Sequence, residues 1–355
     1  MSTRRCPRCG STFDAPARFC QNDGSPLIDV QTPGGATPAG VSRTEVRKAP
    51  VTPGKGGVDR ASSLTGQILD GRYQVIKKLG EGGMSYVYLA RETATNDTVA
   101  IKVLSPKLSN EKSSVERLRR EAGLAMRLDH ANVCKILRLG ETEDGLIYLV
   151  MPYLQGELMS DREIRGGPFT LEQGMPLLIQ MCRGLHHAHE LHIIHRDLKP
   201  ENVMLIEATD VQGGIRAVVM DFGLAKERRA EPEVAKLTAT GIVLGTPEFM
   251  SPEQIRGKTL DGRSDVYALG ILAFEMFTGQ LPFQGRSAQE MMIARLRGNA
   301  MPLRQSKPDL PVKLEQIIAK SLETEPDKRW ESMTTFAEAL SGVGAGTLFQ
   351  KLFKR

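Results

Sequence analysis

The sequence has few cysteines, a single tryptophan and no long apolar run. The cysteines number five in 355 residues, and three of them fall within the first 20 positions. An odd count clustered in this way is not typical of a disulfide framework and instead indicates a metal site in a reducing compartment. The most apolar stretch, residues 268–274, ends at Glu275 and is far shorter than the roughly 18 residues of a membrane span. The basic start lacks the apolar segment of a secretory signal, so we expect a cytoplasmic protein without a transmembrane segment.

The charge is concentrated at the two ends of the chain. The net charge is +5, with +4 in residues 1–66 and three basic residues in the last fourteen positions, which leaves residues 67–341 close to neutral. A nucleic-acid-binding fold usually carries a concentrated basic face, so we do not expect nucleic acid as a partner. Hydrophobic residues make up 40% of the chain, which excludes wholesale disorder.

The pattern along the chain predicts four segments. Residues 1–28 form a small cysteine-containing module. Residues 29–66 are expected to be a flexible linker, because six glycines and four prolines fall within positions 31–60 and such a segment buries too little apolar surface to become ordered. Residues 67–341 are globular, and residues 342–355 are a basic tail that we expect to be frayed, although it could contact a membrane surface or a partner.

The globular segment changes character midway. Alternating apolar residues over 72–104 predict strands, and residues 111–128 have helical spacing. A buried strand is predicted over 147–154, and the segments after it are mostly helical: 171–190, 264–278, 287–297, 312–322 and 333–340. A strand-rich lobe followed by a helical lobe leaves a cleft between them, where ligands commonly bind.

A glycine-rich segment, LGEGGMSYV over residues 79–87, lies between two predicted strands. Glycines allow backbone N–H groups to close over phosphates, but a glycine-rich hairpin turn has the same pattern. Downstream, VAIK places Lys102 on an apolar strand, and Glu121 follows on the predicted helix. An ion pair between them would orient the ammonium group, although a lysine on a strand is more often simply exposed to solvent.

Further motifs follow in a fixed order. HRDLKPEN covers residues 195–202, DFG covers 221–223 and SPE covers 251–253. Together with the glycine loop, VAIK and Glu121, this set resembles the eukaryotic-type protein kinases of the Ser/Thr class, over roughly residues 70–340. The resemblance implies an α+β fold with two lobes: a small antiparallel β-rich N-lobe with one helix, and a large helical C-lobe.

The resemblance also implies a role for each motif residue. Phosphoryl transfer depends mainly on positioning and charge neutralisation. The expected catalytic residues are Asp197, which accepts the proton of the substrate hydroxyl, Lys199 at the γ-phosphate, and Lys102 paired with Glu121. Asn202 and Asp221 are expected to hold Mg²⁺, a cation that prefers oxygen ligands. The expected ATP-binding residues are Leu79, Gly80, Gly82, Gly83, Val87, Ala100, Lys102, Met151, Pro152, Leu154, Asn202 and Asp221.

A few positions depart from the family pattern. Ser85 replaces the third loop glycine, and Pro152 stands where many members carry Glu. Proline lacks an N–H but keeps its carbonyl, which is the group that adenine needs there; the N–H would come from Leu154. Tyr267 replaces a common Trp, yet Asp265 is still expected to hold the backbone of the catalytic loop. Arg329 is expected to pair with Glu253.

The segment between DFG and SPE contains residues that we expect to regulate the activity. In the family, an arginine such as Arg196 commonly pairs with a phosphate on the activation segment, so we predict autophosphorylation at Thr238 and Thr240; otherwise these are solvated loop residues. Thr246 is expected to lie beneath the acceptor hydroxyl of the substrate.

In the N-terminal module the spacing resembles a zinc ribbon, with Cys6, Cys9, Cys20 and Asp23 as candidate Zn²⁺ ligands. Two alternatives stay open: a degenerate ribbon that binds no metal, and a metal site whose fourth ligand is another group.

The sequence therefore predicts a bacterial, cytoplasmic, non-specific serine/threonine protein kinase that uses ATP and Mg²⁺ and phosphorylates proteins. Self-association would allow phosphorylation in trans. The alternative is a catalytically silent scaffold that binds nucleotide and signals through its zinc-ribbon-like module.

Overall fold

The chain divides into two compact units, Met1–Lys55 and Gly56–Arg355. The computed structural model describes residues 3–5, 12–14, 28–29, 60–82, 85–104, 112–222 and 247–352. In the first unit these residues form a three-stranded antiparallel sheet in the order β2-β1-β3. Its strands are β1 (Thr3–Arg5), β2 (Thr12–Asp14) and β3 (Ile28–Asp29).

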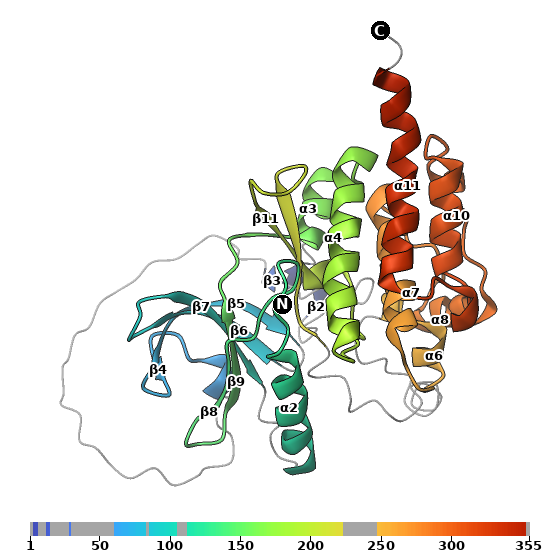
Figure 1. The fold of residues 1–355 in the computed structure, drawn as a ribbon. Coiled ribbons are helices and arrows are strands. Elements are labelled where there is room, and N and C mark those ends of the chain that lie inside the picture. Colours follow the sequence, from blue (N-terminus) through green and yellow to red (C-terminus); the bar gives the residue numbers. More distant parts are fainter. Residues whose placement is uncertain are drawn as a thin grey trace, which may run out of the picture. The chain divides into compact units, whose positions relative to one another are not determined.

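The second unit opens with a β-rich N-lobe (Figure 1). Its antiparallel sheet has six strands in the order β4-β5-β6-β7-β9-β8. These are β4 (Ile68–Leu69), β5 (Tyr73–Gly82), β6 (Ser85–Glu92), β7 (Thr98–Leu104), β8 (Arg138–Glu141) and β9 (Ile147–Pro152). Buried residues alternate along β7, where Val99, Ile101 and Val103 face the core, as expected for a strand with one buried face. Helix α2 (Lys112–Ala125) follows β7, within the predicted range.

The N-lobe begins before the boundary at residue 67 that the sequence predicts. A short 3₁₀ turn, η1 (Arg60–Ser62), precedes β4. Ala61 and Leu64 are fully buried in the same cluster as Tyr88 and Tyr148, and the Tyr88 hydroxyl donates to the Ala61 carbonyl at 2.7 Å. Residues 60–66 therefore belong to the folded lobe, because two apolar side chains and one backbone acceptor in this polar stretch are enough to attach it.

The C-lobe is helical, with a small antiparallel sheet in the order β10-β11-β12. Its strands are β10 (Gly156–Leu158), β11 (Val203–Glu207) and β12 (Ile215–Val219). Its helices are α3 (Met159–Gly166), α4 (Leu171–Glu190), η2 (Pro200–Asn202), η4 (Pro247–Phe249), α6 (Pro252–Ile255), α7 (Gly262–Thr278), α8 (Ala288–Arg297), α9 (Leu303–Ser306), α10 (Val312–Ser321), η5 (Pro326–Lys328) and α11 (Met333–Leu352). Figure 1 shows α4, α7, α10 and α11 packed together.

Helix α7 is the centre of this lobe, because nearly all of its residues are buried. A helix that is apolar on all sides must be surrounded by protein. Asp261 caps its start by accepting from the Arg263 N–H, and Gly279 ends it in the left-handed conformation at φ 70°. The capping aspartate and the terminal glycine are typical helix boundaries.

The helices predicted over 171–190, 264–278, 287–297 and 312–322 are confirmed within a few residues. The last helix differs, because α11 starts at Met333 as predicted but continues to Leu352. Extending a helix that already has a packed first half needs no new nucleation, so the tail continues as helix where we expected a frayed end. No helix in the described ranges combines the length and the apolar character that crossing a membrane requires.

The predicted pairing of Arg329 with Glu253 is confirmed. Both guanidinium Nη atoms contact the carboxylate at 2.7 Å, and both side chains are buried. Burial alone would raise the pKa of Glu253, but its hydrogen bonds with Arg329 lower it. This bidentate pair joins α6 to the segment before α11.

Candidate functional site

The glycine loop lies at the turn between β5 and β6. The two strands pair antiparallel up to Gly82 opposite Ser85; Gly83 lies outside the described residues. A Cβ added to Gly80 would meet no atom within 4 Å, and at Gly82 it would meet only Ser85. By contrast, a Cβ at Gly140 would lie 2.1 Å from the Tyr148 ring. Internal packing therefore explains Gly140 but not the loop glycines, whose open surroundings fit a backbone that approaches a ligand.

Strand β7 carries Lys102 in the middle of the sheet. Lys102 pairs in register with Val87 on β6 and with Leu149 on β9, and Ala100 is opposite Met151. The Lys102 ammonium contacts Asp221 Oδ1 at 2.7 Å. Residues 119 positions apart in the sequence are thus joined across the two lobes.

Asp221 is held in a charged state by this contact. Burial alone would raise its pKa, but the Lys102 ammonium lowers it below its ordinary value. Its backbone adopts φ 59°, which non-glycine residues rarely do. Such conformations concentrate at active sites, where the surrounding structure enforces them.

The catalytic loop is anchored by Asp265, as predicted. This buried carboxylate on α7 accepts from the backbone N–H of His195 at 2.8 Å and from that of Arg196 at 3.0 Å. It also accepts from His189 Nε2 at 2.7 Å. Arg196 adopts φ 65°, and its carbonyl accepts from Gln254 at 2.8 Å. The bend in the loop is therefore fixed from two sides.

Two contacts connect this loop to its neighbours. Asn202 donates its side-chain N–H to the Asp197 carbonyl at 2.7 Å, which leaves the amide oxygen of Asn202 as the atom suited to a cation. His195 donates from Nε2 to the Met220 carbonyl at 2.7 Å, and its ring packs edge-on against Phe222 at 4.7 Å. The HRD and DFG motifs are thereby held next to each other.

The other predicted residues have differing outcomes. Leu79, Val87, Pro152 and Leu154 lie on or beside the strands that face this region, and Glu121 lies half-buried on α2. The pairing of Glu121 with Lys102 stays a prediction. Thr238, Thr240, Thr246 and the candidate zinc ligands Cys6, Cys9, Cys20 and Asp23 fall outside the described residues.

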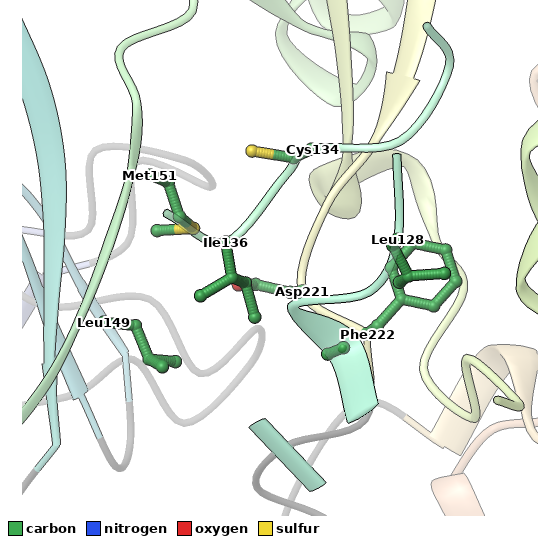
Figure 2. Close-up of a pocket in the computed structure, with 8 residues that line it drawn as sticks. Leu128, Cys134, Ile136, Leu149, Met151, Asp221 and Phe222 are labelled. Atoms are coloured by element: carbon green, nitrogen blue, oxygen red, sulfur yellow. The ribbon is translucent and has the colours of Figure 1, made fainter. Parts of the chain in front are cut away.

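Met151 lines a small apolar pocket (Figure 2). It reaches Asp221 and Phe222, and the remaining lining residues are Ala125, Leu128, Cys134, Ile136 and Leu149. Burial, with a smaller contribution from the Asp221 charge, raises the pKa of the Cys134 thiol to about 12. A thiol that stays protonated at neutral pH is not a nucleophile, so the buried Cys134 side chain serves packing.

The histidines before the catalytic loop serve packing and hydrogen bonding in this structure. His189 binds Asp265, and His187 stacks on His130 with ring centres 5.5 Å apart. Among the described residues no three His, Cys, Asp or Glu side chains are grouped so that they could hold a metal ion.

A two-lobed fold with a glycine loop, a strand lysine paired to an aspartate, and an anchored catalytic loop defines a protein kinase domain. The family profile described as "Protein kinase domain" matches residues 73–340. The chain therefore belongs to the protein kinase family, and the family implies ATP and Mg²⁺.

Sequence comparison finds bacterial relatives. The chain is 36% identical over 291 residues to serine/threonine-protein kinase PrkC of Bacillus subtilis (strain 168), covering 82% of this chain and 43% of PrkC. It is 38% identical over 285 residues to tyrosine-protein kinase MasK of Myxococcus xanthus (strain DK1622), covering 76% of this chain and 42% of MasK. The chain spans about a third to a half of the length of the curated relatives it matches.

Structural comparison agrees. The crystal structure of the Mycobacterium tuberculosis PknI kinase domain matches with a TM-score of 0.60 and 27% identity, covering 78% of this chain and 98% of the PknI chain. The shared part is the kinase domain, and the N-terminal unit lies outside the profile match, which starts at residue 73.

Proposed function

We propose that this chain is a serine/threonine protein kinase that transfers the γ-phosphate of ATP to hydroxyl groups of proteins. The observation that carries the proposal is the Lys102–Asp221 contact at 2.7 Å, beside a catalytic loop in which Asn202 is bonded to Asp197. Each residue type needed for phosphoryl transfer is thus present in one site.

The proposal gives each residue a task. Asp197 accepts the proton of the attacking hydroxyl and orients it, and Lys199 neutralises charge on the transferred phosphate. Lys102 binds phosphate oxygens. Asn202, through its uncommitted amide oxygen, and Asp221, through its ionised carboxylate, would hold Mg²⁺, which when bound supplies neutralisation of the phosphate charge. Both groups are hard oxygen donors and fit that ion.

The adenine site is expected between the lobes. Leu79, Val87 and Ala100 would cover one face of the ring, and the segment from Met151 to Leu154 would supply polar contacts. Pro152 pairs in register with Val99 at the end of β9, and a proline retains a carbonyl that can accept a hydrogen bond. The open space at Gly80 and Gly82 leaves the loop backbone free to approach the phosphates.

The test is phosphate transfer from labelled ATP to a protein acceptor, with Asp197→Asn as the variant. Removing a positioned general base typically costs about 10²–10⁴ in rate, so we expect transfer to fall by at least that range while the melting temperature changes little. If neither protein transfers label but both bind nucleotide, the scaffold alternative is correct.

The acceptor class needs its own measurement, because relatives at similar identity carry both serine/threonine and tyrosine kinase names. Lys199 in the loop resembles the Ser/Thr class. We expect phosphoserine and phosphothreonine, without phosphotyrosine, when labelled products are hydrolysed and separated.

Regulation by autophosphorylation at Thr238 and Thr240 is part of the proposal. Its support is the fixed backbone of Arg196, which places a cation beside the catalytic loop. A phosphate would bring close to two negative charges to such a site. A Thr238→Ala/Thr240→Ala variant with full activity and an unphosphorylated wild-type segment would exclude this control. Phosphorylation in trans would require transient self-association.

The N-terminal unit is proposed to bind Zn²⁺ through Cys6, Cys9, Cys20 and Asp23. In support, β1 ends at Arg5, which pairs with both Thr12 and Ile28. The last residue of β1 and the first residues of β2 and β3 therefore lie together at one end of the sheet. So small a module usually needs a metal to fold. Metal analysis of the purified protein, with Cys6→Ser as control, tests this; absence of zinc in both would refute it.

A cytoplasmic location stays a prediction, which cell fractionation would test.

A further inference from the structure

Two histidine rings stack where the segment that follows α2 meets α4. His130 lies in residues 126–135, which we call the linking segment, and His187 lies on α4. The ring centres are 5.5 Å apart and the ring planes are inclined by 25°. We refer to His130 and His187 as the histidine pair.

Each ring of the histidine pair accepts a hydrogen bond from the backbone of the linking segment. His130 Nδ1 accepts from the Asn132 N–H at 3.1 Å, and His187 Nε2 accepts from the Asp129 N–H at 3.2 Å. A neutral imidazole has one bare nitrogen that can accept, and its other nitrogen carries a hydrogen. The two contacts therefore require both rings to be neutral, each in a defined tautomer.

Protonation of either ring excludes its hydrogen bond. The added proton can bind only to the bare nitrogen, and that nitrogen is the acceptor. After protonation the ring N–H faces a backbone N–H, so an attractive contact becomes a contact between two donors. Protonation of both rings would also place two cations side by side. The neutral pair holds the linking segment, and the protonated pair releases it.

The surrounding charges determine the pH at which this change occurs. The other charged or titratable side chains near the pair on these two elements are Arg183, His186, His189 and Glu190 on α4, and Arg127, Asp129 and Lys135 in the linking segment. The Asp129 carboxylate is engaged by Lys135 at 3.2 Å. Burial, with the charges of His187 and Arg183, lowers the pKa of His130 below its ordinary value of about 6.5. The hydrogen bonds should therefore be intact at neutral pH and lost in mild acid.

The linking segment is anchored to the C-lobe close to the candidate active site. The Asn132 side chain donates to Gln180 Oε1 on α4 at 3.0 Å. The Asn132 carbonyl accepts from the Val219 N–H at 2.9 Å, and the Cys134 N–H donates to the Val219 carbonyl at 2.8 Å. Val219 precedes Asp221 by two residues. This anchor does not depend on the histidines.

The histidine pair extends that anchor toward α2. A Cβ added to Gly184 on α4 would lie 2.7 Å from the Asn132 carbonyl oxygen, so the backbones of α4 and the linking segment are in close contact there. Gly184 and His187 are three residues apart and lie on the same face of α4. The pair therefore fixes the stretch between Asn132 and the end of α2 at Ala125.

We propose that the histidine pair is a pH-sensitive joint, which holds α2 against the C-lobe when neutral and releases it when protonated, so that kinase activity falls in mild acid. Helix α2 carries Glu121, the predicted partner of Lys102, and a released linking segment would no longer fix the position of that helix. The inference rests on the proposed kinase function and adds a regulation to it.

Amide hydrogen exchange of the full chain, followed by NMR, tests the joint without any need for activity. After correction for the intrinsic effect of pH on exchange, protection of the Asp129 and Asn132 amides should fall about fivefold to tenfold between pH 7.5 and pH 5.5, the size expected for one lost hydrogen bond. The Val219 amide, which belongs to the anchor, should keep its protection. Unchanged protection at Asp129 and Asn132 overturns the inference.

A double variant, His130→Asn/His187→Gln, removes the titration and keeps the acceptors. Asparagine accepts readily from the backbone N–H two residues on, and the amide oxygen of glutamine can accept as His187 Nε2 does. The protection of both amides should then be the same at pH 5.5 and pH 7.5. If the double variant is unprotected at both pH values, the ring nitrogen shifts of the wild type decide. A titration midpoint equal to that of the amide protection supports the joint, and a different midpoint overturns it.

The activity assay uses the same two proteins and a matched control. Between pH 7.5 and pH 5.5 the wild type should lose about threefold or more in kcat relative to the double variant, as expected for a histidine that becomes mostly protonated over this range. His186→Gln is the control, because His186 is the neighbouring histidine on α4 and its Nε2 lies 3.6 Å from Glu190. This variant should lose as much activity as the wild type.

The outcomes distinguish this inference from the proposed function. An equal loss of kcat in the wild type and the double variant overturns the control of activity by the pair and leaves the kinase assignment intact. The same protection from acid in His186→Gln as in the double variant also overturns it, because any histidine on α4 would then have the effect. If no phosphate is transferred at any pH, the proposed function fails, and amide exchange still decides whether the joint exists.

Discussion

At the scale of single residues, Glu163 on α3 and Glu275 on α7 have pKa values that burial and neighbouring negative charges raise. Because the folded-state pKa of Glu163 is raised to about 8, folding favours its protonated form. The stabilising effect is complete below the ordinary pKa of a glutamate and is lost as the pH rises through about 8. The free energy of unfolding should therefore decrease over this window.

Glu163→Gln should remove this pH dependence. Allowing for the partial exposure of the side chain, we expect the variant to be more stable than the wild type by about 1–2 kcal/mol near pH 9 and nearly equal to it near pH 5. Urea unfolding at several pH values measures this difference. Equal stability at pH 9 would show that the carboxylate finds a partner in solution.

The sequence motifs single out the residues of the candidate site, but they do not single out Glu163 and Glu275. The motifs VAIK, HRDLKPEN and DFG contain Lys102, Asp197, Asn202 and Asp221. Each motif can be recognised within a few consecutive residues. Glu163 and Glu275 lie more than a hundred positions apart in the sequence, on α3 and α7, and only the folded chain brings these helices into one lobe.

At the scale of elements, the catalytic loop depends on a helix that packs beneath it. Asp265 on α7 accepts hydrogen bonds from two backbone N–H groups of the loop and from His189. Burial alone would raise the pKa of Asp265, and the hydrogen bond from His189 lowers it. Its contribution to stability is therefore present above the ordinary aspartate pKa and is lost as the pH falls toward and below that value.

Asp265→Asn should weaken both the fold and the activity. The amide turns one acceptor oxygen into a donor that faces another donor, so we expect a loss of about 3 kcal/mol, as for other broken buried charge pairs. Because Arg196 would no longer be held at a positive φ, we expect kcat to fall at least tenfold. Thermal unfolding and single-turnover kinetics measure the two effects.

Asp261→Asn is the control for this substitution. Asp261 also lies at the start of α7, but it is an exposed N-cap whose side chain accepts from Arg263. Asparagine is a comparably good cap, so both stability and kcat should stay near wild type. Similar losses in the two variants would mean that α7 itself, and not the loop anchor, is affected.

The main helices are predictable because each has its own hydrophobic periodicity and its own capping residues. Thr170 at the start of α4 and Gly279 at the end of α7 are examples. Elements that depend on a partner are not predictable in this way. The turn η1 and the short strand β4 have too few apolar residues to show a period, and they form because the N-lobe sheet offers them a buried surface.

At the scale of the whole chain, this attachment sets where the kinase unit starts. The family profile begins at residue 73, but backbone hydrogen bonds join Gly66 and Gln67 to Val75, and Leu64 is fully buried. Arg60 also forms an ion pair with Asp144. The segment that leads from the N-terminal unit is thus part of the lobe that carries the glycine loop.

A chain that starts at residue 67 should therefore be less stable than one that starts at Gly56. Burying a leucine side chain contributes about 1.5–3 kcal/mol, and the Tyr88–Ala61 hydrogen bond adds about 1 kcal/mol. At a few degrees per kcal/mol for a domain of this size, the melting temperature should fall by roughly 5–10 °C. Leu64→Ala in the longer chain should reproduce most of the loss of melting temperature, because the buried leucine side chain contributes most of the stabilisation. Thr65→Ala, at the exposed neighbouring position, should leave the melting temperature unchanged. Equal melting temperatures for the two starts would mean that residues 60–66 merely rest on the sheet, and the unit would then begin where the family profile does.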